Sequence, residues 1–222
     1  MKKQPRTVSL ITPYEADLAQ TEIPFSEYPR PMLRRDSYLC LNGVWEFDVI
    51  TKKNPIKNGK IKVPFPPESR LSGIERITQT ADLLRYRRAL TLPDGFIRGR
   101  VILHFGAVDQ QVTVVLNGRR IGSHEGGYLP FSFDITAALR PEENELVVLV
   151  RDPLDHDYPW GKQRYDRGGM WYTPVSGICQ TVRLECVPVD AVENLRVEPS
   201  LDTLCLHVEG GAEEKTLTID TP

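Results

Sequence analysis

The segment from Asp152 to Trp171 carries the densest set of side chains that could bind a polar ligand. Its polar, charged and aromatic members include Asp155, Asp157, Trp160, Lys162, Gln163, Tyr165, Asp166 and Arg167. Carboxylate and amide groups hydrogen-bond to paired hydroxyls, and the faces of tryptophan and tyrosine pack against the apolar side of a pyranose ring. A long polar loop between two strands is also a common place for a binding site. These residue types favour a carbohydrate ligand, and they equally suit a loop that only seals an interface. Trp171, at the end of the segment, is predicted to be a core residue.

Other catalytic schemes find little support in the residue spacing. The four histidines and four cysteines show neither a metal-ligand spacing nor a G-x-S-x-G nucleophile elbow. Each cysteine stands among apolar, strand-like neighbours, which predicts small buried side chains. The cysteines are Cys40, Cys179, Cys186 and Cys205. We therefore expect no metal site and no cofactor.

Composition and charge exclude several classes of partner. A formal net charge of -2, spread along 222 residues, provides no basic patch for nucleic acid. No segment approaches the roughly 18–20 consecutive apolar residues of a membrane span. Met1-Lys2-Lys3 is followed by Gln4-Pro5-Arg6 rather than by the apolar run of a secretory peptide. These features predict a cytoplasmic protein with no membrane partner; the oligomeric state is left open.

Short runs of β-branched and aromatic residues, separated by turn residues, predict an all-β chain. The predicted strands are Val44–Val49, Leu84–Leu92, Arg100–Phe105, Gln111–Leu116, Phe131–Ile135, Glu145–Arg151 and Gln180–Val187. Asn117-Gly118 supplies the two positive φ angles of a type I′ turn, which predicts a hairpin from Val112 to Ile121. A helical turn is expected at Ile135–Leu139. Short strands and tight turns favour two antiparallel sheets packed as a sandwich or jelly roll.

The pattern changes at both ends of the predicted sandwich. Residues 1–40 are polar and proline-rich, which predicts an extended arm packed on a domain at 41–188. Three further strand-like runs, Val192–Val197, Thr203–Val208 and Thr216–Ile219, follow in 189–222. Three strands cannot complete an immunoglobulin-like sandwich, which needs about seven. We therefore expect the sequence to be part of a longer protein.

Several strings, in this order, carry a resemblance to a known family. They are Leu41-Asn42-Gly43-Val44-Trp45-Glu46-Phe47, Val63-Pro64-Phe65-Pro66, Arg85-Tyr86-Arg87-Arg88, Leu103-His104-Phe105-Gly106-Ala107-Val108-Asp109, Gly126-Gly127-Tyr128-Leu129-Pro130-Phe131 and Met170-Trp171-Tyr172-Thr173-Pro174-Val175-Ser176-Gly177-Ile178. Their succession over about 150 residues resembles glycoside hydrolase family 2, the group of β-galactosidases, β-glucuronidases and β-mannosidases. The resemblance implies a galactose-binding-like jelly roll with a sugar-binding role, then an immunoglobulin-like domain and a catalytic (β/α)8 barrel that this sequence lacks.

The resemblance also guides the choice of site residues. Glycoside hydrolysis in its usual retaining form needs two carboxyl groups about 5 Å apart, and the family places both on its barrel. Asn144-Glu145 imitates the family's acid/base pair, but its place between a turn and a buried strand favours a structural role. In the family, a loop at the position of 152–171 offers an aspartate to the bound sugar. Asp166 is the nearest candidate here, with Gln163 and Lys162 as further substrate-binding candidates.

These observations predict the non-catalytic sugar-binding module of a cytoplasmic β-glycosidase, with a β-glycoside and the missing barrel as partners and no catalytic residue of its own. No two acidic side chains stand where they could share the cleavage of an acetal. One alternative is a free-standing carbohydrate-binding module, which would need an autonomous fold and an exposed aromatic platform. Another is a structural β-sandwich that joins protein partners without dependence on sugar.

Overall fold

The computed structural model describes residues 12–155, 157–166 and 168–211, and most of its regular structure is antiparallel β-sheet. The larger sheet has the strand order β3-β2-β4-β10-β7-β8. Its strands are β2 (Gly43–Ile50), β3 (Ile56–Val63), β4 (Leu83–Thr91), β7 (Gln111–Leu116), β8 (Arg119–Glu125) and β10 (Glu143–Arg151). Asn117 and Gly118 join β7 to β8 with φ angles of 54° and 79°, so the predicted hairpin is confirmed.

The smaller sheet has the order β1-β12-β5-β9. It consists of β1 (Tyr38–Cys40), β5 (Arg100–Phe105), β9 (Phe131–Asp134) and β12 (Val182–Val187), and a two-stranded pair is formed by β6 (Val108–Asp109) and β11 (Gly177–Ile178). A 3-10 turn, η3 (Thr136–Ala138), confirms the predicted helical turn. Every predicted strand from 44 to 187 matches an observed strand to within two residues at each end. The sequence pattern misses β3, because lysines and a glycine interrupt its apolar alternation.

The core lies between the two sheets. In β5 and β7 every second residue is buried, as expected for strands with one face toward a core. Phe47 and Val148 from the larger sheet pack with Leu103 and Leu184 from the smaller one in a single hydrophobic cluster. Burial of each such side chain stabilises the fold by about 1.5–3 kcal/mol. The predicted all-β sandwich is confirmed.

The segment before the sandwich is not extended throughout. It contains a six-residue helix, α1 (Glu15–Gln20), and a 3-10 turn, η1 (Pro31–Leu33), before β1 pairs with β12. A second such turn, η2 (Arg70–Ser72), follows β3. The ammonium of Lys62 donates to the carbonyls of Leu18 and Ala19 at 2.6 and 2.9 Å, where a cation complements the helix dipole. Within the described ranges, no helix is long and apolar enough to cross a bilayer.

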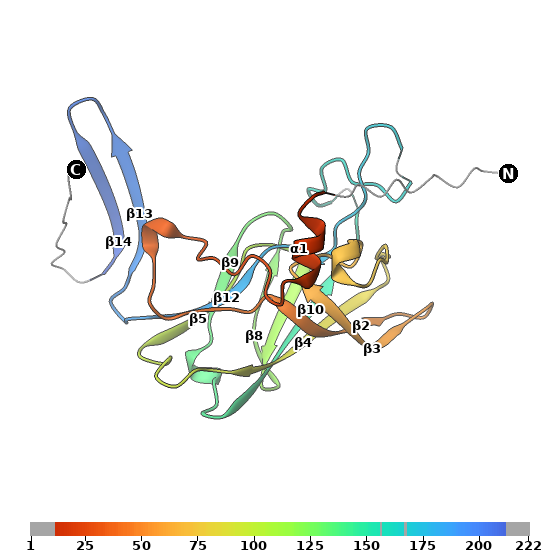
Figure 1. Cartoon of the computed structure of the whole chain (residues 1–222), viewed down its shortest axis with the longest axis horizontal. Helices are drawn as coiled ribbons and strands as arrows, with labels where there is room; N and C mark the ends of the chain where they lie inside the picture. Colours follow the sequence, from red (N-terminus) through yellow and green to blue (C-terminus); the bar gives the residue numbers. More distant parts are fainter. Residues whose placement is uncertain (1–11, 156, 167, 212–222) are drawn as a thin grey trace.

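A hairpin of β13 (Val192–Pro199) and β14 (Leu204–Gly210) projects from the sandwich and forms its own two-stranded sheet (Figure 1). The third predicted run, Thr216–Ile219, lies outside the described residues, and the domain boundary at 188 stays a prediction. Cys40 and Cys186 are buried and Cys179 is half-buried, but Cys205 on β14 is exposed. The prediction of four buried cysteines is therefore wrong for Cys205, because β13 and β14 form a separate two-stranded sheet and no described residue covers this face of it.

Candidate functional site

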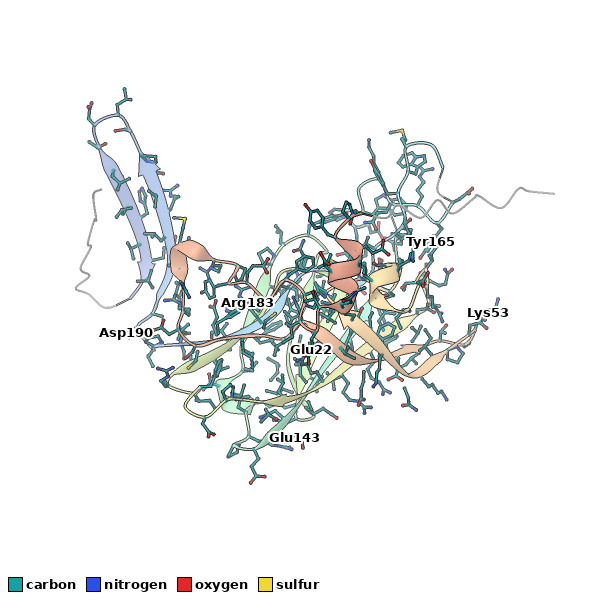
Figure 2. All side chains as sticks on the ribbon, in the orientation of Figure 1. Glu22, Lys53, Glu143, Tyr165, Arg183 and Asp190 are labelled. Carbon is teal, nitrogen blue, oxygen red and sulfur yellow. The ribbon has the colours of Figure 1, made fainter. Side chains whose placement is uncertain are left out.

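The loop between β10 and β11 is held in shape by its own backbone. The amide of Tyr172 donates to the carbonyl of Lys162 at 2.9 Å, and the amide of Arg164 donates to the carbonyl of Tyr172 at 3.0 Å. These two bonds form a parallel bridge between Gln163 and Tyr172. Figure 2 shows that Tyr165 lies at the end of the sandwich opposite the β13–β14 hairpin. The loop is therefore a defined surface on which side chains can be positioned.

The three predicted substrate-binding residues lie on this loop in different settings. Lys162 and Asp166 expose their side chains to solvent. Gln163 is half-buried: its amide donates to the hydroxyl of Tyr128 at 3.2 Å, and its oxygen accepts from the amide of Val175 at 2.5 Å. Gln163 thus fixes the loop against the turn after β8. Arg167, from the same predicted set, lies outside the described residues.

Aromatic side chains on the loop and on the turn after β8 differ in their exposure. Trp171 is not a core residue; it is half-buried, and the guanidinium carbon of Arg164 lies 3.9 Å from its ring centroid. Tyr172 is 66% exposed and Tyr128 is 55% exposed, which leaves ring surface that could pack on a sugar. The only signal in the sequence that could place Tyr128 at this site is its position after two glycines, because its hydrogen-bond partner Gln163 is distant along the chain.

Three carboxyl groups, Glu68, Asp109 and Asp152, gather beneath the loop, and the sequence pattern does not predict this cluster. Asp152 accepts from the hydroxyl of Ser176 at 2.7 Å and from the amide of Leu154 at 3.0 Å. Glu68 accepts from the amides of Thr78 and Ser176 at 3.1 and 3.2 Å. Ser176 therefore bridges two of the three carboxyl groups.

Burial shifts the titration of this cluster upward. Desolvation, followed by the negative charge of Asp152, raises the pKa of Asp109 to about 7. Desolvation also raises the pKa values of Asp152 and Glu68, although hydrogen bonds to their carboxylates oppose the shift. Asp109 is only 5% exposed, and a side chain at Gly127 would place its Cβ 2.5 Å from the Asp109 carboxyl carbon. The backbone at Gly127 thus closes over this carboxyl group.

The carboxylates of Glu68 and Asp152 are tied to the surrounding chain by hydrogen bonds. Each oxygen of Glu68 and Asp152 already accepts a hydrogen bond from the protein, which leaves poor access for an incoming sugar. An acid and nucleophile for glycoside hydrolysis must instead reach the scissile bond from two sides. The three carboxyl groups come from different parts of the chain: Asp109 lies in β6, Asp152 follows β10, and Glu68 lies after β3. The cluster therefore lies where these three segments meet beneath the loop.

A groove of about 940 Å³ lies elsewhere, on the outer face of the larger sheet. Its aromatic lining residue, Trp45, is 1% exposed and cannot present a ring face to a sugar. Asn144 also lines it and is buried, where its carboxamide bonds the Arg140 backbone and the amide of Asn117. Asn144 therefore has the structural role that its position predicts, and the neighbouring Glu145 is exposed to solvent.

Comparison with known proteins agrees with this architecture. A family model described as glycosyl hydrolases family 2, sugar binding domain, matches residues 71–188. The β-galactosidase of Aeromonas hydrophila subsp. hydrophila is 32% identical over 143 residues, which are 64% of this chain and 13% of that protein. The β-glucuronidase of Paenibacillus borealis is 26% identical over 142 residues, which are 58% of this chain and 23% of that protein.

A solved structure, the β-glucuronidase of an uncultured Clostridium sp., superposes with a TM-score of 0.65 and 27% identity. The match covers 80% of this chain and 34% of that one. The chain therefore spans less than a quarter of each of the two curated relatives and about a third of this solved chain. Since the family model covers more than half of its residues, the chain belongs to glycosyl hydrolase family 2 and contains that family's sugar-binding domain.

Proposed function

We propose that this chain is the non-catalytic, sugar-binding front end of a β-glycosidase that hydrolyses β-galactosides or β-glucuronides. The main support is the match of residues 71–188 to a sugar-binding domain. The chain also spans less than a quarter of the length of each of the two glycosidases compared above. The bonding of Glu68 and Asp152 supports it, since these carboxylates are engaged in holding the loop. Hydrolysis then depends on carboxyl groups of a barrel outside this sequence.

The loop between β10 and β11 is the part of this chain that we assign to the substrate. Lys162 and Asp166 expose a cation and a carboxylate on a loop whose shape Gln163 fixes. Asp166 accepts hydrogen bonds from sugar hydroxyls, and Lys162 donates to hydroxyls or to a uronate. Gln163 acts as a positioning residue, because both ends of its amide are bonded to protein.

Assay of the 222-residue chain on 4-nitrophenyl β-galactoside and β-glucuronide tests the non-catalytic role. We expect no hydrolysis above the buffer rate, because neither Glu68 nor Asp152 can approach a glycosidic oxygen without losing its bonds to the protein. Activity that disappears in a single variant, Asp109→Asn, Asp152→Asn or Glu68→Gln, would overturn the proposal. Stable binding of other proteins regardless of sugar would instead indicate a structural sandwich.

The loop assignment is tested in the complete glycosidase that contains this chain. Asp166→Asn and Lys162→Ala should each lower kcat/KM by about tenfold or more, since a hydrogen bond to a charged group contributes about 1.5–3 kcal/mol. Lys53→Ala is the matched control, because Lys53 is an exposed lysine on the turn between β2 and β3 (Figure 2). Unchanged kinetics in both loop variants would show that the loop only seals the interface with the barrel.

The rival function, a free-standing carbohydrate-binding module, is tested by calorimetry with methyl β-galactoside and methyl β-glucuronoside. We expect weak binding by the isolated chain, because Trp45, the aromatic residue in the groove on the outer face of the larger sheet, is buried. A dissociation constant near about 10 μM or tighter would correspond to roughly 7 kcal/mol of binding free energy and would favour the module.

A further inference from the structure

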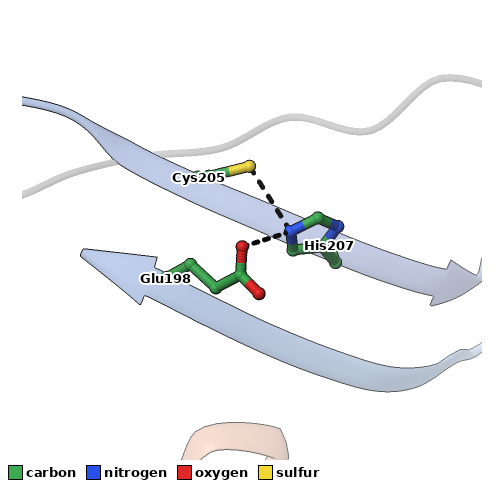
Figure 3. Close-up of side chains that lie close together, drawn as sticks. All are labelled: Glu198, Cys205 and His207. Atoms are coloured by element: carbon green, nitrogen blue, oxygen red, sulfur yellow. Dashed lines mark hydrogen bonds and ion pairs between the residues drawn. The ribbon is translucent and has the colours of Figure 1, made fainter. Parts of the chain in front are cut away.

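One face of the β13–β14 hairpin brings together three different metal-ligating side chains (Figure 3). Glu198 on β13 stands directly opposite Cys205 on β14, and His207 follows two residues later on the same face of the strand. The sulfur of Cys205 lies 3.5 Å from Nε2 of His207, and Oε2 of Glu198 lies 2.9 Å from the same nitrogen. The three ligand atoms lie within 4.8 Å of one another.

The convergence on one nitrogen distinguishes this cluster from a catalytic relay. In a nucleophile–histidine–carboxylate relay, the nucleophile and the carboxylate bond to different ring nitrogens. Here Cys205 and Glu198 both face Nε2, so a single proton on that atom can bond only one of them. A cation that replaces this proton would accept lone pairs from all three atoms at once. The arrangement therefore suits a metal ion better than proton transfer.

We propose that Glu198, Cys205 and His207 form a site for Zn²⁺ or a cation of similar size and softness, with water as a fourth ligand. Thiolate, imidazole and carboxylate are all common zinc ligands. With zinc bonds of about 2.3 Å to sulfur and about 2.0 Å to nitrogen and oxygen, tetrahedral geometry separates sulfur from nitrogen by about 3.5 Å and nitrogen from oxygen by about 3.3 Å. The first distance is already present in the hairpin, and the second needs the carboxylate to withdraw by about 0.4 Å.

Binding at this site must release a proton. The Cys205 thiol gives up its S–H proton as the sulfur–zinc bond forms, and Nε2 of His207 must present its lone pair rather than an N–H. The charge of the cation is then offset by one thiolate and one carboxylate. No electron is transferred, so no oxidant or reductant is required.

The surroundings of the cluster support the carboxylate as a ligand. Arg196 contacts Oε1 of Glu198 at 3.2 Å, which holds the carboxylate by the oxygen that does not face His207. Outer-shell contacts of this kind orient metal ligands. The opposite face of the hairpin carries apolar side chains, including Leu195, Val197 and Leu206, so a further protein layer would pack there and leave the ligand face in solvent. The proposed site is therefore compatible with a complete second domain.

Cobalt titration of the reduced chain tests the proposal. Co²⁺ should bind at one equivalent and give the thiolate-to-cobalt charge-transfer absorption, and Zn²⁺ should displace it with release of protons to a weak buffer. Cys205→Ser should abolish that absorption. Both Cys205→Ser and Glu198→Gln should weaken zinc binding by at least about tenfold, because loss of even an outer-shell contact can weaken metal binding by that factor. Glu209→Gln is the matched control, since Glu209 is an exposed carboxylate on the same hairpin.

Alkylation of the unmodified chain provides a second readout that does not depend on the folding of any variant. Cys205 is the exposed cysteine, and Cys40 and Cys186 are buried, so iodoacetamide should label Cys205 first. Saturating Zn²⁺ should slow this labelling by at least about tenfold, because the bound thiolate is no longer a nucleophile. Equal labelling rates with and without Zn²⁺, or a cobalt spectrum without the thiolate band, would overturn the proposed site.

Discussion

Replacement of Asp109 by Asn should stabilise the chain at alkaline pH and have little effect in acid. The folded carboxyl titrates at about 7 rather than at its ordinary 3.8, because burial and the neighbouring Asp152 disfavour its charge. Between these two pH values the folded state retains a proton that the unfolded state has released. Stability therefore falls as the pH rises from about 4 to 7, and the loss is complete above pH 7.

The size of the effect follows from the two pKa values. Each pKa unit corresponds to about 1.4 kcal/mol, so a shift of roughly three units sets an upper limit of about 4 kcal/mol. The pKa of about 7 already includes the lowering effect of the hydrogen bond from Gln163, but this bond is stronger to a carboxylate than to the neutral oxygen of asparagine, so the variant loses part of it. We expect Asp109→Asn to gain about 2–3 kcal/mol at pH 8, which is a rise of roughly 5–10 °C in Tm for a chain of this size.

Thermal unfolding of both proteins between pH 4.5 and pH 8.5 measures this difference. The gain in Tm should be largest at pH 8 and should shrink to under about 2 °C at pH 4.5, where Asp109 is protonated and resembles asparagine. Asp190→Asn is the control, because Asp190 is an exposed aspartate (Figure 2). The reasoning is refuted if the Asp109→Asn difference in Tm does not change with pH, or if it increases toward acid.

Two further substitutions examine buried polar groups of the sandwich. Burial would raise the pKa of Glu185, but the imidazole of His104 at 3.3 Å and the hydroxyl of Tyr28 at 2.8 Å hold it at about 2. Glu185→Gln should therefore cost about 1–3 kcal/mol above pH 5. Since this lowered pKa stabilises the fold above about pH 4.5, urea unfolding should show the cost shrinking as the pH falls toward 2; an equal cost at pH 7 and pH 3 would contradict it. Asn144→Ala should cost about 2–3 kcal/mol, because it removes a buried carboxamide that bonds both the amide and the carbonyl of Arg140. Glu145→Gln should change stability by under about 0.5 kcal/mol, because Glu145 is exposed. Urea midpoints measure both, and equal effects of the two variants would refute the structural role of Asn144.

The sequence by itself determined the fold class and most of the strands. Alternation in Arg100–Phe105 and Gln111–Leu116 is a property of neighbouring residues, and the Asn117-Gly118 turn needs only local backbone geometry. The ordered family motifs also fixed the family, which the match of residues 71–188 confirms. The place of Lys162, Gln163 and Asp166 on a surface loop followed from composition, while their role toward a sugar remains a prediction.

Only the tertiary structure decided which distant residues meet. The contact of Asp109 with the loop, the bridge of Ser176 between Glu68 and Asp152, and the exposure of Cys205 depend on pairing across the sheets. A linear pattern cannot reveal such contacts, because the pKa of a carboxyl group and the burial of a thiol depend on neighbours that are far away in the chain. Strands are therefore readable from local periodicity, whereas the carboxyl cluster and the proposed metal site exist only once the strands have paired.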